Sequence, residues 1–538
     1  MNQYLLIVAI ITIICIVSSK ISAKIGLPSL LLFILIGMLF GSDGIFKIQF
    51  DDFVLSEQLC TIALIFIIFY GGFGMNLKSA KPIMGKALLL STVGTFMTAM
   101  ITGFLVHFIF KVSLAEGILI GSVIGSTDAA SVFSILRGKK LNLKKGLAPL
   151  LEMESGSNDP ISYMMTTLTL GYMTTNSLST LPQLLISQIG LGVLCGFAIG
   201  QLFKVILEHV KFKNDGLKSI LFVAIALLAF ALPTMWEGNG FLSVYIVGVL
   251  LGNAKLKHKV ALVHFFDGIT QMMQILLFFT LGLLAFPSQI PNVLLPALGV
   301  MVIITFIARP ITVAILLTPL KVKWNEQLFI SWSGLRGAAS IVFAILTVVS
   351  PAYTSKDIFH VVFVVALLSV AFQGTLLPYM AKKLKVEDPT NDIMKTFNDY
   401  EGIRQLSMIQ VSLPEYHGWI GKTLADIAMP NDMLIALIVR DGENIFPKGS
   451  TVVEEQDSLV LCAPSFHDES GIILEEVIVD EDNDWLNKTL DDIDKENRLL
   501  IISIKRNKNI IIPNGETILE LHDSIVYMDV GNNVIKRA

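Results

Sequence analysis

Gly-Ser-Thr-Asp-Ala-Ala-Ser-Val-Phe-Ser occupies residues 125–134, and Glu-Met-Glu-Ser-Gly-Ser-Asn-Asp-Pro occupies residues 152–160. Both peptides lie inside stretches that are otherwise apolar enough to span a bilayer. Their notable polar members are Thr127, Asp128, Glu154, Ser155, Asn158 and Asp159. Ionisable groups at bilayer depth are costly unless they face a cavity or a partner, so these residues mark a candidate functional site.

Charge divides the chain into two parts near Val386. Residues 1–386 contain 27 Lys and Arg against 15 Asp and Glu, whereas the remaining residues contain 13 against 29. The formal net charge of −4 therefore describes neither part. We predict an all-α membrane domain over residues 1–386 and a linker over residues 387–400, followed by an acidic soluble region.

The four cysteines show no metal-binding spacing, and no cluster of nucleophile, base and orienting residue is evident. We therefore expect no cofactor, no disulfide framework and no enzymatic activity. No nucleic-acid partner is expected either.

Polar breaks divide residues 1–386 into about 13 apolar segments, most of them long enough to cross a hydrocarbon core of roughly 30 Å. They lie at roughly residues 3–19, 27–41, 55–74, 86–110, 114–136, 146–173, 183–207, 216–234, 240–253, 262–286, 291–318, 325–350 and 357–381. Alternate loops carry 22 and 3 Lys and Arg residues, and these residues accumulate on the cytoplasmic side of membrane proteins. This split predicts a prokaryotic cytoplasmic (inner) membrane protein with its N-terminus outside and its C-terminal region in the cytoplasm.

Five charged residues lie at similar depths in this arrangement. Counted along their spans at 1.5 Å per residue, all five lie roughly 12 to 20 Å above the cytoplasmic face. They are Asp128, Glu154, Asp159, Arg309 and Arg336. These side chains can therefore meet near the midplane, as ion-site residues or as structural groups. Depth alone does not decide which arginine faces Glu154.

Two of these charges stand in sequences that favour interruption of a helix. Asp128 follows Gly-Ser-Thr, and Arg336 stands in Ser-Gly-Leu-Arg-Gly at residues 333–337. Interrupted helices in corresponding positions of two halves point to a transporter binding site. In the span that follows the first of them, Ser155 and Asp159 are i,i+4 neighbours on one helix face.

At these residues the chain resembles the monovalent cation:proton antiporter-1 family, in its prokaryotic NhaP branch, over the whole membrane part. The resemblance is carried by Ser-Thr-Asp-Ala-Ala at 126–130, Glu-Ser-Gly-Ser-Asn-Asp-Pro at 154–160, Ala-Arg-Pro at 308–310 and Gly-Leu-Arg-Gly at 334–337. It implies inverted repeats, crossed broken helices in spans 5 and 12, and a homodimer.

The resemblance also implies an ion site. Its ion-binding and proton-exchanging residues would be Asp159, Asp128, Asn158, Ser155 and Thr127. Of these, Asp159, Ser155 and the Thr127 backbone would contact the transported alkali cation. Glu154 would form a structural ion pair with Arg309, and Arg336 would support the site. Some relatives add an acidic side chain from span 3, but Phe-Tyr-Gly-Gly-Phe at residues 69–73 offers none.

A single carboxylate with two competing ligands accounts for exchange. Burial disfavours the charged form of Asp159, so a proton or an alkali ion can each neutralise it, but not both at once. Alternating access then exchanges one ligand for the other. A second aspartate in place of Asn158 would allow two protons per cycle, so the asparagine predicts one-for-one, electroneutral exchange.

The C-terminal region contains an internal repeat with a shift of 66 residues. Trp-Ile-Gly-Lys-Thr-Leu-Ala-Asp at 419–426 aligns with Trp-Leu-Asn-Lys-Thr-Leu-Asp-Asp at 485–492, and about 19 of 42 positions from Trp419 to Val460 are identical. Each copy contains a β-branched run typical of a strand, at 434–439 and at 499–504. We predict two small α+β domains, over residues 401–466 and 467–538.

Each copy resembles the TrkA-C, or RCK C-terminal, domain found on potassium channels and transporters. The Gly-rich fingerprint of the usual nucleotide-binding RCK partner is absent from the sequence. The resemblance implies that such domains pair and bind a small regulator, such as a cyclic dinucleotide or nucleotide. It also favours potassium over sodium as the transported ion.

A ligand-gated potassium channel with RCK-type domains is the alternative function. It would need a Thr-Val-Gly-Tyr-Gly filter, and Thr-Val-Gly-Thr-Phe at residues 92–96 is the nearest match, without the tyrosine. A membrane sensor without transport would leave two buried aspartates unexplained. The sequence therefore predicts a secondary transporter that exchanges potassium, or sodium, for protons and is regulated by its tail.

Overall fold

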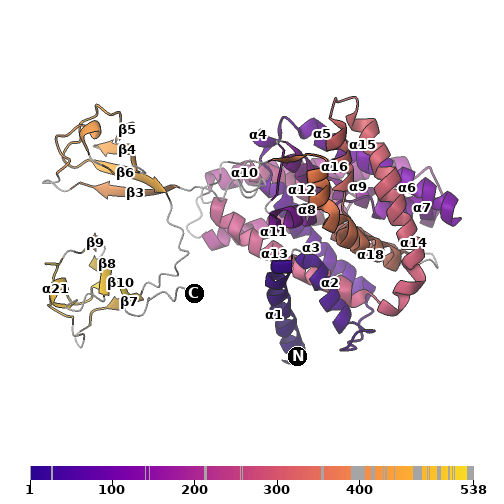
Figure 1. Cartoon of the computed structure of the whole chain (residues 1–538), viewed down its shortest axis with the longest axis horizontal. Helices are drawn as coiled ribbons and strands as arrows, with labels where there is room; N and C mark the ends of the chain where they lie inside the picture. The colour runs from indigo at the N-terminus through magenta and orange to yellow at the C-terminus, as the bar shows by residue number, and fades with distance from the viewer. Residues whose placement is uncertain are drawn as a thin grey trace. The chain divides into compact units, whose positions relative to one another are not determined.

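The 13 apolar stretches each coincide with a helix or a run of helical pieces in the computed structural model of the chain (Figure 1). The structure describes residues 2–25, 28–139, 141–144, 146–210, 215–254, 256, 259–352, 357–388, 406–413, 418–427, 429, 433–440, 443–464, 475–480, 483, 485–493, 499–506, 509–511, 513 and 515–529. The chain forms two units, Met1–Ile403 and Arg404–Ala538, and each is described by itself.

The helices of the first unit fall into three kinds. Uninterrupted helices are α1 (Asn2–Ile25), α2 (Ser29–Phe40), α3 (Phe53–Gly74), α4 (Leu77–Ala80), α9 (Leu147–Thr175), α10 (Leu181–His209), α11 (Asp215–Thr234), α12 (Gly240–Gly252) and α13 (Lys259–Leu284). Helices with a π-helical segment are α5 (Met84–Leu89), η1 (Leu90–Gly94) and α6 (Thr95–Phe110); α14 (Ile290–Val302), η3 (Ile303–Ala308) and α15 (Arg309–Leu317), preceded by the short η2 (Pro287–Gln289); and α18 (Ile358–Leu368), η4 (Ser369–Gly374) and α19 (Thr375–Lys383). Interrupted helices are α7 (Leu114–Val123) with α8 (Ala129–Gly138), and α16 (Trp324–Trp332) with α17 (Ala338–Val349).

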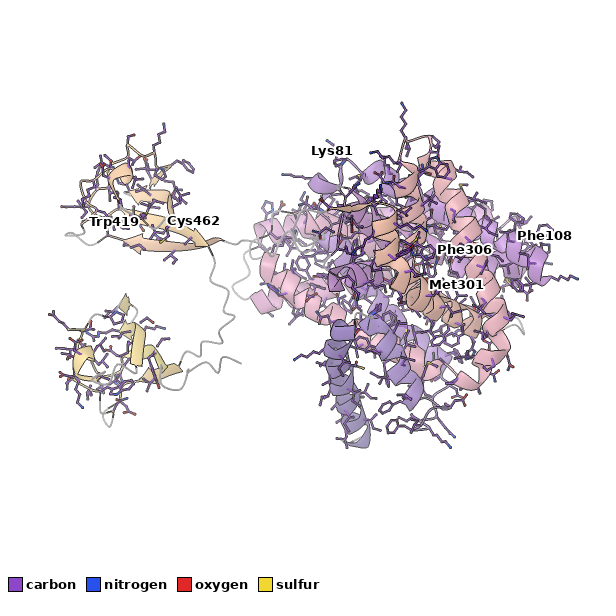
Figure 2. The ribbon with its side chains drawn as sticks, in the orientation of Figure 1. Lys81, Phe108, Met301, Phe306, Trp419 and Cys462 are labelled. Atoms are coloured by element: carbon purple, nitrogen blue, oxygen red, sulfur yellow. The ribbon has the colours of Figure 1, made fainter. Side chains whose placement is uncertain are left out.

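Among the described residues, eight helices are long and apolar enough to cross a membrane. Four shorter apolar helices accompany them, and two of these, α7 and α17, are halves of the interrupted helices. The unit carries large apolar side chains on its outside, such as Phe108 and Phe306, which are 72% and 54% exposed (Figure 2). Such a surface suits lipid rather than water. The number of crossings, 13 by sequence, stays a prediction.

The two interruptions contact each other through their backbones. The Asp128 N–H donates to the Leu335 carbonyl at 2.8 Å. They also share a sequence signal that the sequence analysis overlooked: Gly-x-x-x-Ala-Ala-Ser occupies residues 125–131 and again residues 334–340. In both copies the Ala-Ala-Ser segment begins the second half-helix. The two interruptions therefore share a local sequence pattern and contact each other.

The second unit holds two four-stranded antiparallel sheets of the same topology. The first contains β3 (Leu406–Ser412), β4 (Leu434–Arg440), β5 (Glu443–Ile445) and β6 (Ser458–Pro464) in the order β3-β6-β4-β5, with η5 at Leu424–Asp426. The second contains β7 (Glu475–Ile478), β8 (Leu499–Arg506), β9 (Asn509–Ile511) and β10 (Ser524–Asp529) in the order β7-β10-β8-β9, with α21 at Leu490–Ile493. Buried Ile438 and Leu459 have Ile504 and Ile525 as their counterparts 66 residues later. The predicted strands 434–439 and 499–504 are confirmed as β4 and the larger part of β8.

A short ribbon forms where the helical unit ends. β1 (Asn142–Leu143), in the loop after α8, pairs antiparallel with β2 (Glu387–Asp388). β2 begins four residues after α19 ends at Lys383. The Lys144 N–H also donates to the Val386 carbonyl at 2.8 Å. Residues 387 and 388, assigned to a linker from the sequence, are therefore part of the folded unit. The rest of that segment lies outside the described residues.

Arg440 forms a buried clamp in the first tail domain. Its Nε and Nη2 donate to the two oxygens of Asp457, each at 2.8 Å, and the Asp457 side chain is fully buried. Burial alone would raise the pKa of Asp457, but the hydrogen bonds from Arg440 and the Glu454 N–H, with the charge of Arg440, lower it. A lowered pKa in the folded state contributes stability above the unfolded pKa, about 4, which is lost as pH falls through the folded pKa.

Arg440→Met is expected to lower the free energy of unfolding of the first tail domain by about 2–3 kcal/mol at neutral pH, because it leaves Asp457 buried without its partner. Hydrogen–deuterium exchange of the full chain should show faster exchange in β4 and β6. The strands β8 and β10, held by the equivalent Arg506–Asp523 clamp, provide the internal control. Unchanged exchange in β4 and β6 would contradict the stabilising role.

Candidate functional site

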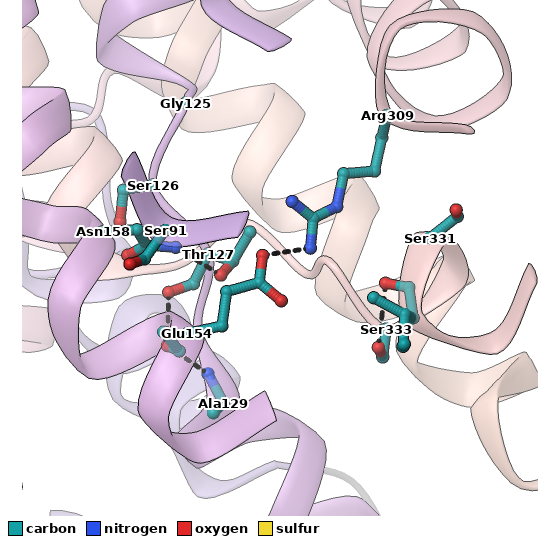
Figure 3. A network of polar contacts seen from close by, with 12 residues as sticks. Ser91, Gly125, Ser126, Thr127, Ala129, Glu154, Asn158, Arg309, Ser331 and Ser333 are labelled. Atoms are coloured by element: carbon teal, nitrogen blue, oxygen red, sulfur yellow. Dashed lines mark hydrogen bonds and ion pairs between the residues drawn. The ribbon is translucent and has the colours of Figure 1, made fainter. Parts of the chain in front are cut away.

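The first interruption, residues 124–128, lies against one face of α9. Ser155 Oγ donates to the Thr127 carbonyl at 2.6 Å and accepts the Ala129 N–H at 2.9 Å. Asn158 Nδ2 donates to Thr127 Oγ1, also at 2.6 Å (Figure 3). Two predicted cation ligands, Ser155 and the Thr127 carbonyl, are thus hydrogen-bonded to each other. A cation would have to share or replace this bond.

Asp159 holds the same interruption from the next position of α9. The Ser126 hydroxyl donates to Asp159 Oδ1. One turn further on, Ser162 Oγ accepts the Ser126 N–H at 3.1 Å and donates to the Ser122 carbonyl. Positions 155, 158, 159 and 162 have the i, i+3, i+4, i+7 spacing of one helix stripe. This stripe satisfies backbone groups that the end of α7 and the start of α8 leave without partners inside their helices.

Ser126 and Ser162 are site residues that the sequence analysis missed. Ser162 is seven residues beyond Ser155, so the stripe containing Ser155 and Asp159 predicts its position. Ser126 stands inside the Ser-Thr-Asp-Ala-Ala motif, where nothing in the pattern distinguishes its hydroxyl as a site group. Its hydroxyl is the hydrogen-bond donor to Asp159 among the described residues.

Asp128 lies at the start of α8 and against the second interruption. Its Oδ1 accepts the Ser131 N–H at 3.2 Å, and its Oδ2 accepts the Ser131 hydroxyl at 2.6 Å. Gly337, which precedes α17, is so close that a Cβ built on it would lie 2.4 Å from Asp128 Cβ. The carboxylate therefore lies near the N-terminal ends of two half-helices, which carry partial positive charge.

Gly337→Ala is expected to push the two interruptions apart, because real Cβ atoms do not approach other atoms this closely. The expected loss is about 1–3 kcal/mol of stability, seen as a lower thermal unfolding midpoint in detergent, with weaker cation binding. Gly138→Ala, on α8, is the matched control, since nothing lies within 4 Å of a Cβ built there. Equal behaviour of the two variants would show that the close approach is unimportant.

Arg336 joins the two interruptions from the other side. Its side chain is buried, and Nη1 lies 2.7, 2.9 and 2.9 Å from the carbonyl oxygens of Ile124, Gly125 and Ser126. These carbonyls follow the end of α7, where the helix dipole places partial negative charge. The guanidinium therefore compensates the end of α7, and it does not contact Glu154 by a described hydrogen bond.

Glu154 pairs with Arg309. The Arg309 Nη2 hydrogen-bonds to Glu154 Oε1, and the two residues are 2% and 1% exposed (Figure 3). Arg309 directly follows the π-helical segment η3. Depth along the spans does not distinguish Arg309 from Arg336 as the partner of Glu154. In the structure the partner is Arg309.

A cavity of about 880 Å³ reaches the first interruption. Its charged lining residues are Lys20, Asp128, Glu152, Asp159 and Asp267. Ser126, Thr127 and Ser155 also line it. Glu154, Asn158 and Arg309 are not among its lining residues, and all three are buried. Of the predicted site residues, the cavity therefore brings together Asp128, Asp159, Thr127 and Ser155.

Family models match both parts of the chain. The transmembrane model of the sodium/hydrogen exchanger family matches residues 7–383, and the TrkA-C domain model matches residues 408–465 and 474–526. The two TrkA-C matches agree with the repeat of the tail.

Curated relatives and solved structures agree with this match. The chain is 33% identical to a protein named K(+)/H(+) antiporter NhaP from Alkalimonas amylolytica, over 86% of this chain and 81% of the relative. It is 34% identical to K(+)/H(+) antiporter NhaP2 from Shewanella baltica, over 86% and 80%. The structure of the sodium proton antiporter MjNhaP1 from Methanocaldococcus jannaschii superposes with a TM-score of 0.64 at 24% identity, covering 71% of this chain and 99% of that one, which shows a shared fold.

These matches reject the channel alternative, because the matched membrane family consists of exchangers. The resemblance to cation:proton antiporters with tandem TrkA-C domains is confirmed. The chain belongs to the sodium/hydrogen exchanger family.

Proposed function

We propose that this protein exchanges a monovalent cation for protons, one for one, across a prokaryotic cytoplasmic membrane. The observation that carries the proposal is the placement of Asp159. Its carboxylate lies at a helix interruption, lines the large cavity, and accepts one described hydrogen bond, from Ser126. It is thus reachable by an ion and incompletely satisfied by the protein.

The neighbours of Asp159 suit an exchange of ligands. Thr127 and Ser155 offer oxygen atoms at the same cavity wall, as an alkali cation requires. Asn158 is fully buried, and its neutral amide does not titrate. A cation and a proton therefore compete for one carboxylate of α9, and one-for-one exchange follows. Asp128, at the same cavity, supports the site electrostatically.

Potassium is the favoured cation. The relatives at 33–34% identity are named K(+)/H(+) antiporters, whereas Na(+)/H(+) antiporter 1 from Methanocaldococcus jannaschii is 26% identical over 61% of this chain. Sodium remains the second candidate, since the oxygen ligands at the cavity wall bind either ion.

The cavity supports an inward-open arrangement. Its wall includes Lys20, Gly138 and Glu152, which lie next to loops that the charge bias assigns to the cytoplasm. The N-terminus would then lie outside and the tail inside, and the interrupted helices would cross between inverted repeats. We include the homodimer that the family resemblance implies in this proposal.

Proteoliposomes containing the full chain and an internal pH dye test the function. An imposed potassium gradient should drive proton movement in the opposite direction, and a sodium gradient should drive it less. Exchange rates that are the same at different clamped membrane voltages would support one-for-one exchange. A clear voltage response would refute that stoichiometry, and no response to either cation gradient would refute exchange.

The tail is proposed to regulate exchange, with a small ligand such as a cyclic dinucleotide or nucleotide. The β1–β2 ribbon supports this, because it ties the segment leading to the tail to the loop after α8, the half-helix that follows Asp128. A movement of the tail that pulls on β2 would therefore be passed to β1 and α8, and α8 begins directly after Asp128.

Removing residues 401–538 is expected to change the pH profile or regulation of exchange while leaving transport. This deletion keeps both strands of the ribbon and every described helix of the first unit. Exchange rate against pH in proteoliposomes is the measurement. A folded truncation without any exchange would show instead that the tail is part of the transport mechanism.

A further inference from the structure

Ser369 and Gln373 form a buried polar pair on η4, and the mechanism above uses neither. Each is 1% exposed. Ser369 Oγ donates to Gln373 Oε1 at 3.1 Å and accepts the Arg336 N–H at 3.0 Å. Gln373 Nε2 donates to the Trp332 carbonyl at 2.5 Å, and the Trp332 indole N–H donates back to the Gln373 carbonyl at 3.1 Å. The pair therefore holds both sides of the second interruption.

This arrangement parallels the one at the first interruption. Ser155 and Asp159 have i,i+4 spacing on α9, and Ser155 Oγ accepts the N–H of Ala129. Ser369 and Gln373 have the same spacing, and Ser369 Oγ accepts a backbone N–H of the other interruption. Gln373 thus contributes to a serine-containing i,i+4 pair that holds the second interruption, as Asp159 does at the first, although the residues contacted are different.

The side chains of Gln373 and Asp159 differ in their chemistry. A glutamine amide both donates and accepts hydrogen bonds, and it does not titrate near neutral pH. A carboxylate at this place could not donate to the Trp332 carbonyl when ionised. It would also add a second titratable group. The amide therefore holds the second interruption without adding a titratable group there.

A chain of contacts links this pair to the ion site. Arg336, held through its backbone by Ser369, contacts the carbonyls of residues 124–126 through its side chain. The last of these residues, Ser126, donates its hydroxyl to Asp159. Moving Arg336 would therefore move the donor to Asp159. The π-helical form of η4 is consistent with a functional position, because such segments are frequent at functional sites.

The geometry points to Ser369 and Gln373 as positioning residues for cation–proton exchange. They hold Arg336 so that the first interruption presents Ser126 and the Thr127 carbonyl to the transported ion. This assignment rests on the exchange activity proposed above. Neither residue lines the large cavity, so they act through Arg336 and not by touching the ion.

The test compares Ser369→Ala with Ser369→Thr in the full chain, reconstituted with a potassium gradient. The alanine variant loses the acceptor for the Arg336 N–H and should raise the half-saturating potassium concentration roughly tenfold, the equivalent of one hydrogen bond. The pH dependence of exchange should shift with it. The threonine variant keeps the hydroxyl and should behave as the wild type. Thr375→Val is the matched control, because that exposed hydroxyl bonds only to the Ala371 carbonyl of its own helix among the described contacts.

Gln373→Leu should give the larger rise in half-saturating potassium, and Ser369→Ala serves as the milder change if the leucine variant does not fold. Hydrogen–deuterium exchange over residues 332–337 should be faster in Ser369→Ala and unchanged in Ser369→Thr. The assignment is overturned if the alanine variant loses folded protein but keeps the wild-type potassium and pH dependence. If the wild type itself exchanges neither potassium nor sodium for protons, the proposed function is refuted, and the positioning role is refuted with it.

Discussion

Asp159→Asn is expected to reduce cation–proton exchange to the level of empty liposomes. The amide has nearly the same size and can still accept the Ser126 hydroxyl, so the interruption should stay in place. It cannot take up or release a proton near neutral pH, and it offers a cation a neutral oxygen instead of a charged one. Both competing ligands therefore lose their site. The measurement is the internal pH response of proteoliposomes to a potassium gradient.

Asp267→Asn is the matched control for this experiment. Asp267 also lines the cavity, but it lies on α13, which is neither an interrupted helix nor the helix of Asp159. It should keep most of the exchange rate. Persistent exchange in Asp159→Asn would refute the site assignment, whereas loss in both variants would indicate a general requirement for negative charge in the cavity.

Arg309→Ala is expected to destabilise the membrane unit by about 3–5 kcal/mol, because it leaves the buried Glu154 side chain without its ion-pair partner. We expect little folded protein to be recovered, in contrast to Asp159→Asn, which should fold normally. The yield of monodisperse protein in detergent and its thermal unfolding midpoint are the measurements.

The double variant Glu154→Gln with Arg309→Met separates structure from transport. It removes both charges together, and such replacements of buried pairs are often close to neutral. We therefore expect it to recover stability relative to Arg309→Ala and to retain exchange, since neither residue lines the cavity. A folded double variant without exchange would show that the pair has a direct part in transport.

Much of the helical unit could be predicted because the signals are local. Apolar length and polar breaks predicted where helices lie, and Gly-rich sequences around Asp128 and Arg336 predicted where two of them are interrupted. The repeat in the tail predicted two domains of one topology, and the sheets have the same strand order. In each case the information lies within one segment of the chain.

The remaining features depend on contacts between distant segments. The choice of Arg309 over Arg336 as the partner of Glu154 follows from helix rotation, which depth along the spans does not contain. The ribbon between β1 and β2 joins residues more than 240 positions apart, and such short strands have no periodicity to detect. Ser162 and Gln373 are uncharged residues in apolar helices, where hydroxyl and amide groups also serve ordinary structural purposes.

Proton release on cation binding would reveal directly whether a cation and a proton compete for Asp159. Full-length protein in weakly buffered detergent solution, at a pH where Asp159 is partly protonated, should release protons into a pH dye when potassium is added. We expect the wild type to release up to about one proton per chain and the release to saturate with potassium. Asp159→Asn should show no such release. Potassium binding without proton release, or equal release by Asp159→Asn, would contradict the competition of cation and proton for this carboxylate.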